Sequence, residues 1–125
     1  MKKHFRAGLM ALQLLSFLPA QAGIVELRSV TDFSNIIRSG AVVVYFYKPN
    51  CKFCTATNSV IPNVARQFPK VTFLKVNVAQ FPGLKSFSTV PHLRCYKNGS
   101  AAFSISDSKG ITVAHLTASL KRIFG

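Results

Sequence analysis

The chain has 125 residues, of which 49% are hydrophobic and 15% charged, so a single globular domain is expected and a disordered chain or coiled coil is excluded. Lys and Arg number 16 against three acidic residues, which excludes paired-carboxylate catalysis, calcium ligation and acidic magnesium clusters. The three Cys cannot form a fully paired disulfide framework.

The first 22 residues have the order of a secretory signal. A basic start at 2–6 precedes an apolar stretch at 7–18 and a small-x-small pattern, Ala-Gln-Ala, at 20–22. The stretch is shorter than the ~20 residues that cross a bilayer as a helix. We therefore expect a signal peptide over 1–22, a mature domain over 23–125, and a periplasmic or secreted location. An uncleaved segment that anchors the protein in a membrane is the alternative.

The segment after residue 22 alternates between predicted strands and helices. A short strand at 23–28 precedes a helix that ends near Gly40, where cap and stop signals frame an apolar periodicity. Residues 41–47 are rich in β-branched and aromatic side chains without alternation, which is typical of a strand buried on both faces. A helix is expected after Cys54, followed by a second buried strand at 71–78.

The second half of the chain predicts a hairpin and a final helix. The expected order is a mixed segment at 79–88, a strand at 92–96, a turn at 97–99, a strand at 101–106, and a helix from Ser108, as its cap, to Phe124. The whole pattern indicates one α/β domain with a mixed sheet.

Two cysteines three residues apart carry the candidate chemistry. Cys51 and Cys54 lie between a buried strand and a helix, where unpaired backbone N–H groups favour a thiolate at Cys51. Cys54, one turn into the helix, can close a small ring with it. Lys48 and Lys52 add positive charge in the same direction. We predict that Cys51 is the nucleophile and Cys54 the resolving thiol, with Lys48, Lys52 and Phe53 tuning the site.

Other uses of the pair remain open. Two Cys are half of a zinc site, and Cys95, His92, His115 or His4 could supply the remaining ligands. A purely structural bridge is another alternative, although the loop that it would close is small and so stabilises little. We expect no metal and no cofactor.

With these features in place, the sequence resembles the thioredoxin-fold family over nearly all of residues 24–124. Cys51 and Cys54 match the active-site cysteines, and Val90 and Pro91 match the apolar residue and cis-proline that face them. The resemblance implies a thioredoxin-like fold, a central mixed sheet of order βαβαββα flanked by helices. It also implies that Pro91 is cis and that Val90 and Pro91 dock an extended substrate segment.

The chain departs from the family's pattern at several positions. Tyr45 stands where thioredoxins have a buried acid, and Asn50 replaces the usual aromatic residue before the first cysteine. The dipeptide 52–53 matches none of the well-known pairs. Ser59 replaces the usual helix proline, while Pro62 is expected to bend or interrupt the helix. These departures leave the direction of the reaction and the partner open.

Four other residues of the second half carry ionisable or reactive side chains. Cys95 lies in a predicted strand and is expected to be a small buried hydrophobe. His92 either lies at the rim of the dithiol site, where it would tune Cys51, or simply begins a strand. The residue pattern gives no account of Arg94, and His115 is expected to be exposed.

The expected function is that of an exported thiol:disulfide oxidoreductase. Its partners would be protein thiols and disulfides, with a membrane redox partner for recycling, and we expect a monomer. Oxidation or isomerisation is favoured over reduction because of Lys48, Lys52 and the missing acid. The basic residues are spread singly, which argues against nucleic acid but not against anionic surfaces. The alternative is a non-catalytic binding or assembly module, or a metal carrier that uses the cysteine pair.

Overall fold

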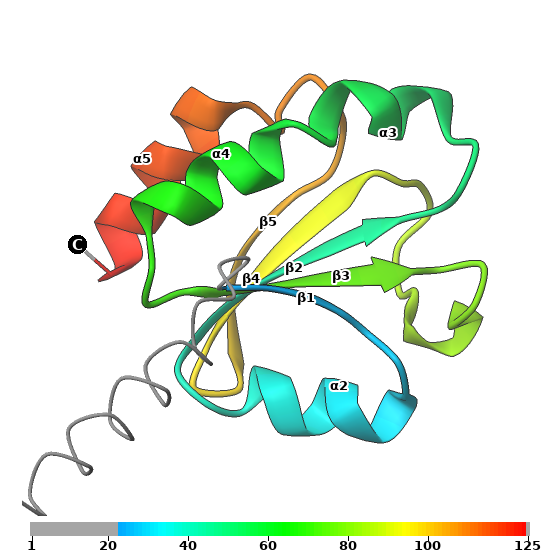
Figure 1. Ribbon diagram of the computed structural model, residues 1–125, viewed down its shortest axis with the longest axis horizontal. Coiled ribbons are helices and arrows are strands. Elements are labelled where there is room, and N and C mark those ends of the chain that lie inside the picture. The colour runs from blue at the N-terminus through cyan, green and yellow to red at the C-terminus, as the bar shows by residue number, and fades with distance from the viewer. Residues whose placement is uncertain (1–22, 125) are drawn as a thin grey trace, which may run out of the picture.

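The computed structural model describes residues 23–124, which form a five-stranded mixed sheet with helices on both faces (Figure 1). The strands are β1 (Ile24–Glu26), β2 (Ala41–Tyr47), β3 (Thr72–Asn77), β4 (His92–Lys97) and β5 (Ser100–Ile105). The helices are α2 (Val30–Ile37), α3 (Lys52–Thr57), α4 (Val60–Gln67), the 3-10 helix η1 (Pro82–Leu84) and α5 (Val113–Phe124). The predicted signal peptide over 1–22 lies outside the described residues.

The strand order is β1-β3-β2-β4-β5. The first three strands in this order are mutually parallel, whereas β4 runs antiparallel to β2 and β5 antiparallel to β4. The predicted thioredoxin-like fold with a central mixed sheet is confirmed. Within residues 23–124, no helix is both long enough and apolar enough to span a membrane.

The central strand β2 is buried on both faces, as its continuous apolar sequence predicts. Val43 and Tyr45 belong to the core that α4 and α5 cover, while Val42, Val44 and Phe46 belong to the core on the α2 side. Burial on both sides fixes the carboxyl end of β2, and the chain leaves this fixed end directly toward the two cysteines.

The helix that carries the cysteines is interrupted, as predicted. Asn58 and Ser59 separate α3 from α4, and Pro62 lies in the first turn of α4. Proline has no N–H to donate to the carbonyl of Asn58, four residues earlier, and its ring crowds that carbonyl. The helix therefore breaks one turn before the proline, and α3 remains a short separate element.

The final helix does not begin at Ser108, and that prediction is wrong. A turn occupies this position instead, in which the Asp107 carboxylate accepts the N–H of Gly110 at 2.9 Å. The hydroxyl of Thr112 accepts the N–H of His115 at 3.1 Å, which is the bond expected of a helix cap. The helix begins after this later cap, so the loop that contains Ser108 stays free to line a surface hollow.

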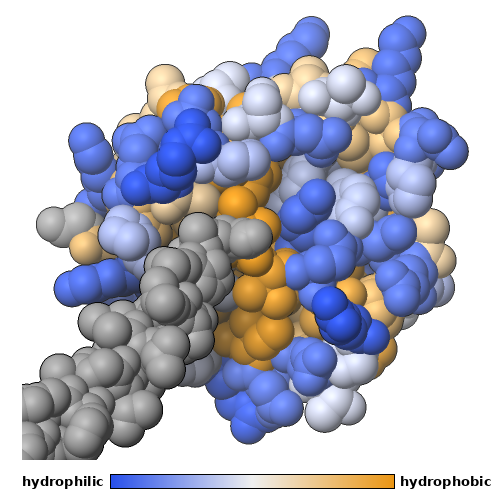
Figure 2. Space-filling view, viewed as in Figure 1, coloured by the Kyte–Doolittle hydropathy of each residue, from blue (hydrophilic) through white to orange (hydrophobic). Residues whose placement is uncertain are grey.

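Hydrophilic side chains cover most of the face seen in Figure 2, around an apolar band across its middle. Three large hydrophobic side chains of the described residues are exposed: Val25, Val30 and Phe53. Phe53 is the most exposed of them, at 62%, and it lies between the two cysteines. The exposed ring of Phe53, beside the cysteine pair, therefore offers an apolar contact surface to a partner protein.

Candidate dithiol active site

Cys51 and Cys54 are joined by a disulfide at the beginning of α3, with 5.1 Å between their Cα atoms. Cys51 is the cap residue of α3, and its Sγ accepts the backbone N–H of Cys54 at 3.1 Å. Cys51 is 8% exposed and Cys54 2%. The two predicted thiols therefore lie within bonding reach, and the first is the more accessible.

Three lysines line a hollow of about 350 Å³ on the Val90 side of Cys51. Lys48 follows β2, Lys52 is the first residue of α3, and Lys85 follows η1. The sequence predicted the first two as neighbours of the cysteines. It gave no indication of Lys85, because the segment around η1 has no periodic pattern that would place it.

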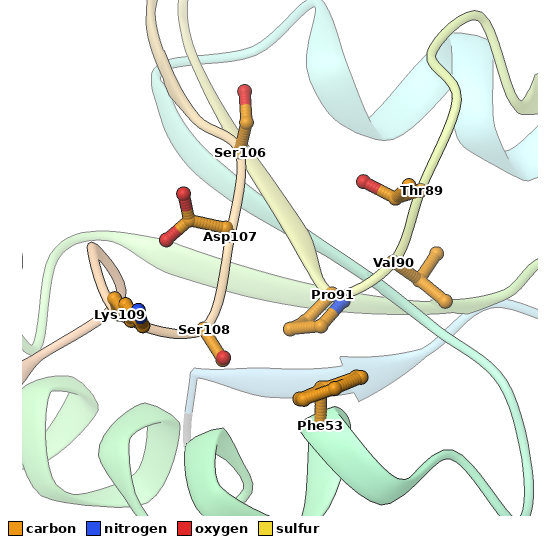
Figure 3. A pocket seen from close by; sticks show the side chains of 8 residues that line it. All are labelled: Phe53, Thr89, Val90, Pro91, Ser106, Asp107, Ser108 and Lys109. Carbon is orange, nitrogen blue, oxygen red and sulfur yellow. The ribbon is translucent and has the colours of Figure 1, made fainter.

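A second hollow, of about 380 Å³, lies beside Phe53 and the cis peptide bond between Val90 and Pro91. Figure 3 shows the Phe53 ring opposite Pro91, with the hydroxyl of Ser108 directed toward the ring. Thr89, Ser106, Asp107 and Lys109 complete the lining. The two residues predicted to dock a substrate both border this hollow, and Val90 also lines the hollow that contains Cys51.

A third hollow, of about 300 Å³, borders both cysteines, shares Lys48 with the lysine hollow, and includes Tyr47, Asn58 and Lys75 in its lining. The Nζ of Lys75 lies 4.8 Å from the centre of the Tyr47 ring, and the Tyr47 hydroxyl donates to Glu26 at 2.6 Å. Burial and the Glu26 carboxylate both raise the pKa of Tyr47. Glu26 thus contacts this hollow only through the Tyr47 hydroxyl and does not line it.

Tyr45 occupies the position beneath the disulfide where the family has an acid. Its hydroxyl oxygen lies 2.7 Å from the Thr57 hydroxyl and 3.0 Å from the Asn58 side-chain oxygen. The Thr57 hydroxyl also donates to the Cys54 carbonyl at 2.9 Å. Burial raises the pKa of Tyr45, so the group stays neutral. The sequence identified the replacement, but not this network, which joins β2 to the end of α3.

His92 lies on the α2 side of the sheet, paired with Phe46 on the neighbouring strand. Its ring stacks on Phe87 with 4.0 Å between centroids, and none of the three hollows includes it. Burial, and then the nearby Arg94 cation, lower the pKa of His92. The structure thus places His92 at the start of a strand and not among the groups around Cys51.

Arg94 and Cys95 also have structural explanations. The Arg94 guanidinium lies 5.7 Å from the Phe87 ring centre and donates to Ser86 at 3.1 Å, which holds the loop before β4 against the sheet. Cys95 is fully buried, and burial raises the pKa of its thiol to about 12. Among residues 23–124, no group of three or more His, Cys, Asp or Glu is placed to hold a metal ion.

The sequence of this chain is similar to those of known proteins. A sequence model of the family described as Thioredoxin matches residues 24–122. Thioredoxin of Chlamydia trachomatis serovar D is 32% identical over 78 residues, which are 60% of this chain and 76% of that protein. Phosducin of Bos taurus is 32% identical over 93 residues, 70% of this chain, and the chain spans only 38% of phosducin.

Solved structures agree with the fold. Thioredoxin of Trypanosoma brucei brucei superimposes with a TM-score of 0.73 at 21% identity, covering 85% of this chain and 96% of that one. Thioredoxin O2 of Arabidopsis thaliana in its oxidized state gives a TM-score of 0.70 at 24% identity, with 84% and 97% covered. At these identities the superpositions show a shared fold.

Proposed function

The chain belongs to the thioredoxin family, and on that premise we propose that it is an exported thiol:disulfide oxidoreductase that exchanges disulfides with protein thiols. Members of this family act on protein disulfides and thiols, and the Cys51–Cys54 pair supplies the dithiol that this chemistry requires. The pair at the start of α3, bordered by open hollows, is the observation that carries the proposal.

The exchange proceeds in two balanced steps. The Cys51 thiolate attacks one sulfur of a substrate disulfide, which forms a mixed disulfide and releases the other substrate sulfur as a thiolate. The Cys54 thiolate then attacks Cys51, which releases the second substrate thiolate and leaves the Cys51–Cys54 disulfide. In the opposite direction, a substrate thiolate attacks Cys51 of that disulfide, which forms a mixed disulfide and releases the Cys54 thiolate. A second thiolate of the substrate then attacks the substrate sulfur of the mixed disulfide, which forms the substrate disulfide and releases the Cys51 thiolate.

The contacts of Cys51 support its role as the attacking group. The N–H of Cys54 donates to the Cys51 sulfur, and Lys48 and Lys52 bring positive charge to the same hollow, so the negative thiolate is favoured over the neutral thiol. Phe53, Val90 and Pro91 provide the adjacent apolar contacts for the substrate chain.

We further propose that the protein acts in the direction of oxidation or isomerisation. Stabilising the Cys51 thiolate stabilises the reduced pair, which makes the disulfide a stronger oxidant. The hydroxyl of Tyr45 cannot replace a buried carboxylate as a proton acceptor, because its raised pKa keeps it neutral. Both features disfavour a reductase, which must regenerate a strongly reducing dithiol.

Export belongs to the same proposal, since disulfides persist outside the cytosol. The signal-like segment at 1–22 would direct a monomeric protein to the periplasm or the medium, where a membrane redox partner would recycle the dithiol. Expression of the full chain in a bacterium tests this step. Mass spectrometry of the exported protein is expected to find Gly23 as the first residue, and retention of residues 1–22 in the membrane fraction would contradict export by cleavage.

The exchange reaction is tested with scrambled ribonuclease and with insulin as substrates. The wild-type protein is expected to restore ribonuclease activity faster than it reduces insulin. Cys51→Ser should abolish both reactions, whereas Cys54→Ser should accumulate a mixed disulfide with the substrate, visible by mass spectrometry without reductant. Equal trapping by the two variants would contradict the assigned roles, and Cys95→Ser, which alters only the buried thiol, is the matched control.

A further inference from the structure

We propose that the site selects substrates whose reacting cysteine is flanked by acidic residues on one side only. The inference rests on the proposed thiol-disulfide exchange and names the substrate class of that same site. It follows from the uneven distribution of charge around Cys51.

Positive charge converges on one hollow from three separate segments. Lys48, Lys52 and Lys85 come from the end of β2, from α3 and from the loop after η1, and all three side chains are exposed. Asn50, Cys51, Phe53, Val78, Ser88, Thr89 and Val90 complete the lining, so no acidic residue takes part in it. A ligand in this hollow therefore meets three cations and no anion.

The three acidic residues of the chain are all occupied elsewhere. Glu26 accepts a hydrogen bond from the Tyr47 hydroxyl, and Asp32 lies in the first turn of α2. Asp107 accepts the N–H of Gly110. The positive charge of the lysine hollow is thus left without a neutralising partner from the protein itself.

The neighbouring hollow, beside Pro91, has a different character. Asp107 and Lys109 both line it and their charges offset each other, while Phe53 and Pro91 provide apolar contacts. Figure 3 shows the Asp107 carboxylate directed away from Pro91. The third hollow, which also contains Cys51, adds Lys48 and Lys75 and no acid, so the surroundings of Cys51 itself are positive. A substrate chain that runs from Cys51 toward Pro91 therefore meets net positive charge at one end and a nearly neutral, apolar surface at the other.

An acidic peptide segment fits this arrangement. Carboxylates entering a concave site lined by cations gain attraction that accelerates encounter and that salt screens. The lysines line a hollow whose lining also includes Cys51, so a substrate that reacts there brings its neighbouring residues within reach of the three cations. A lipid headgroup layer, which is broad and flat, would instead require cations spread across an open face.

The experiment uses four peptides of equal length, each with one cysteine blocked as a disulfide with a small neutral thiol. In the first peptide three Asp precede the cysteine, and in the second three Asp follow it. In the third peptide three Lys precede the cysteine, and in the fourth three Asn precede it. The rate constant with the reduced protein is divided by that with mercaptoethanol, which removes differences in intrinsic peptide reactivity. The Asp peptide whose carboxylates enter the lysine hollow is expected to react about tenfold faster than the Asn peptide at low salt, and about twofold faster at 0.5 M salt.

Lysine variants connect the preference to the hollow. Lys85→Gln, which lies outside the helix of the cysteines, is expected to lower the ratio of Asp to Asn rates about threefold, and Lys48→Gln should act similarly. The exposed Lys70 and Lys121 provide the matched controls Lys70→Gln and Lys121→Gln, for which the ratio should not change. Each ratio compares two substrates of one protein, so a change in the thiolate fraction of Cys51 cancels.

The possible outcomes separate this inference from the proposed function. Equal acceleration of both Asp peptides would overturn it, because overall charge alone would then explain the effect. Reaction of all peptides at one rate would also overturn it while leaving thiol-disulfide exchange intact, whereas no reaction with any peptide would remove both. If Lys85→Gln weakened binding to phosphatidylglycerol vesicles but left the peptide ratio unchanged, a lipid surface would be the occupant and the inference would be wrong.

Discussion

The hydroxyl of Tyr45 joins the strand beneath the disulfide to the end of α3. Removing it in Tyr45→Phe leaves the buried Thr57 hydroxyl and the Asn58 amide oxygen without this partner. Loss of one partner of a buried hydrogen bond costs roughly 1–3 kcal/mol, which urea unfolding should measure. Tyr47→Phe, at a half-buried ring whose partner Glu26 is exposed to water, should cost less.

The same variant tests whether Tyr45 transfers protons. Because burial raises its pKa, the phenol is neutral between pH 6 and 9 and contributes no charge change in that range. The pH profile of thiol-disulfide exchange in Tyr45→Phe is therefore expected to match the wild-type profile. A displaced profile would contradict a purely positioning role.

His92 makes the stability of the fold depend on pH. Its pKa is lowered from the model-compound value of 6.5, first by burial and then by the Arg94 cation. Below about pH 7 the unfolded chain binds more protons at this position than the folded chain does. The contribution of neutral His92 to the free energy of unfolding is therefore fully present above pH 6.5 and is lost as the pH falls toward the folded-state pKa. The unfolding free energy should decrease by at most about 1.4 kcal/mol per pH unit in this range.

Two histidine variants isolate this effect. His92→Phe keeps an aromatic ring to stack on Phe87 but removes the titrating group, so the loss of stability between pH 7 and 5 should become smaller. His115→Gln, at an exposed residue of α5, is the comparison variant. An unchanged slope in His92→Phe would assign the pH dependence to other groups.

At the scale of elements, the hairpin between β4 and β5 depends on two residues with positive φ. Asn98 has φ 51° and Gly99 φ 90°, which is the backbone of the tight turn that the Asn-Gly pair predicts. A side chain at Gly99 meets no contact closer than 3.8 Å, so the backbone alone sets the cost of Gly99→Ala. We expect a loss of about 1–2 kcal/mol in urea unfolding. Gly83→Ala, at a position with open space and no positive φ, should change stability far less.

The regular elements could be predicted because their signals are local. The apolar run at 41–47 matches β2 residue for residue, and Ser29 caps α2 through the N–H of Asp32. The start of α5 could not be predicted in this way. A Cβ at Gly110 would lie 2.9 Å from a methyl of Ile105, so this turn approaches β5 closely enough to require glycine, a tertiary contact that the local sequence does not reveal.

The candidate site also combines residues that local sequence brings together with residues that only the tertiary fold brings together. Cys51, Cys54 and Lys52 lie within four consecutive residues, so the sequence alone brings them together. Lys85 and Asp107 reach the site from loops whose path depends on tertiary contacts, such as the Phe87 ring packed against Phe46 at 4.7 Å between centroids. Sequence patterns identify the reacting atoms, whereas the residues that surround a substrate require the folded chain.

At the scale of the whole molecule, the excess of positive charge should determine the reduction potential. The full chain carries a formal charge of +13, of which Lys2, Lys3 and Arg6 leave with the proposed signal peptide, so residues 23–125 retain +10, with Lys48, Lys52 and Lys85 lining the hollow that contains Cys51. Positive charge stabilises the Cys51 thiolate and hence the reduced protein. Equilibration with glutathione is therefore expected to give a potential above the roughly −270 mV of thioredoxins and toward the roughly −120 mV of the strongest disulfide oxidases.

Stability measurements give an independent check on that potential, because the redox and folding equilibria share one thermodynamic cycle. A disulfide that is easier to reduce in the folded chain than in the unfolded chain makes the reduced protein the harder one to unfold, by about 1.4 kcal/mol for each 30 mV of difference. Urea unfolding with and without reductant should show this order, and high salt should narrow the gap as it screens the lysines. A potential at or below −270 mV, together with an oxidised form that resists urea better, would instead identify a reductase and contradict the proposed direction.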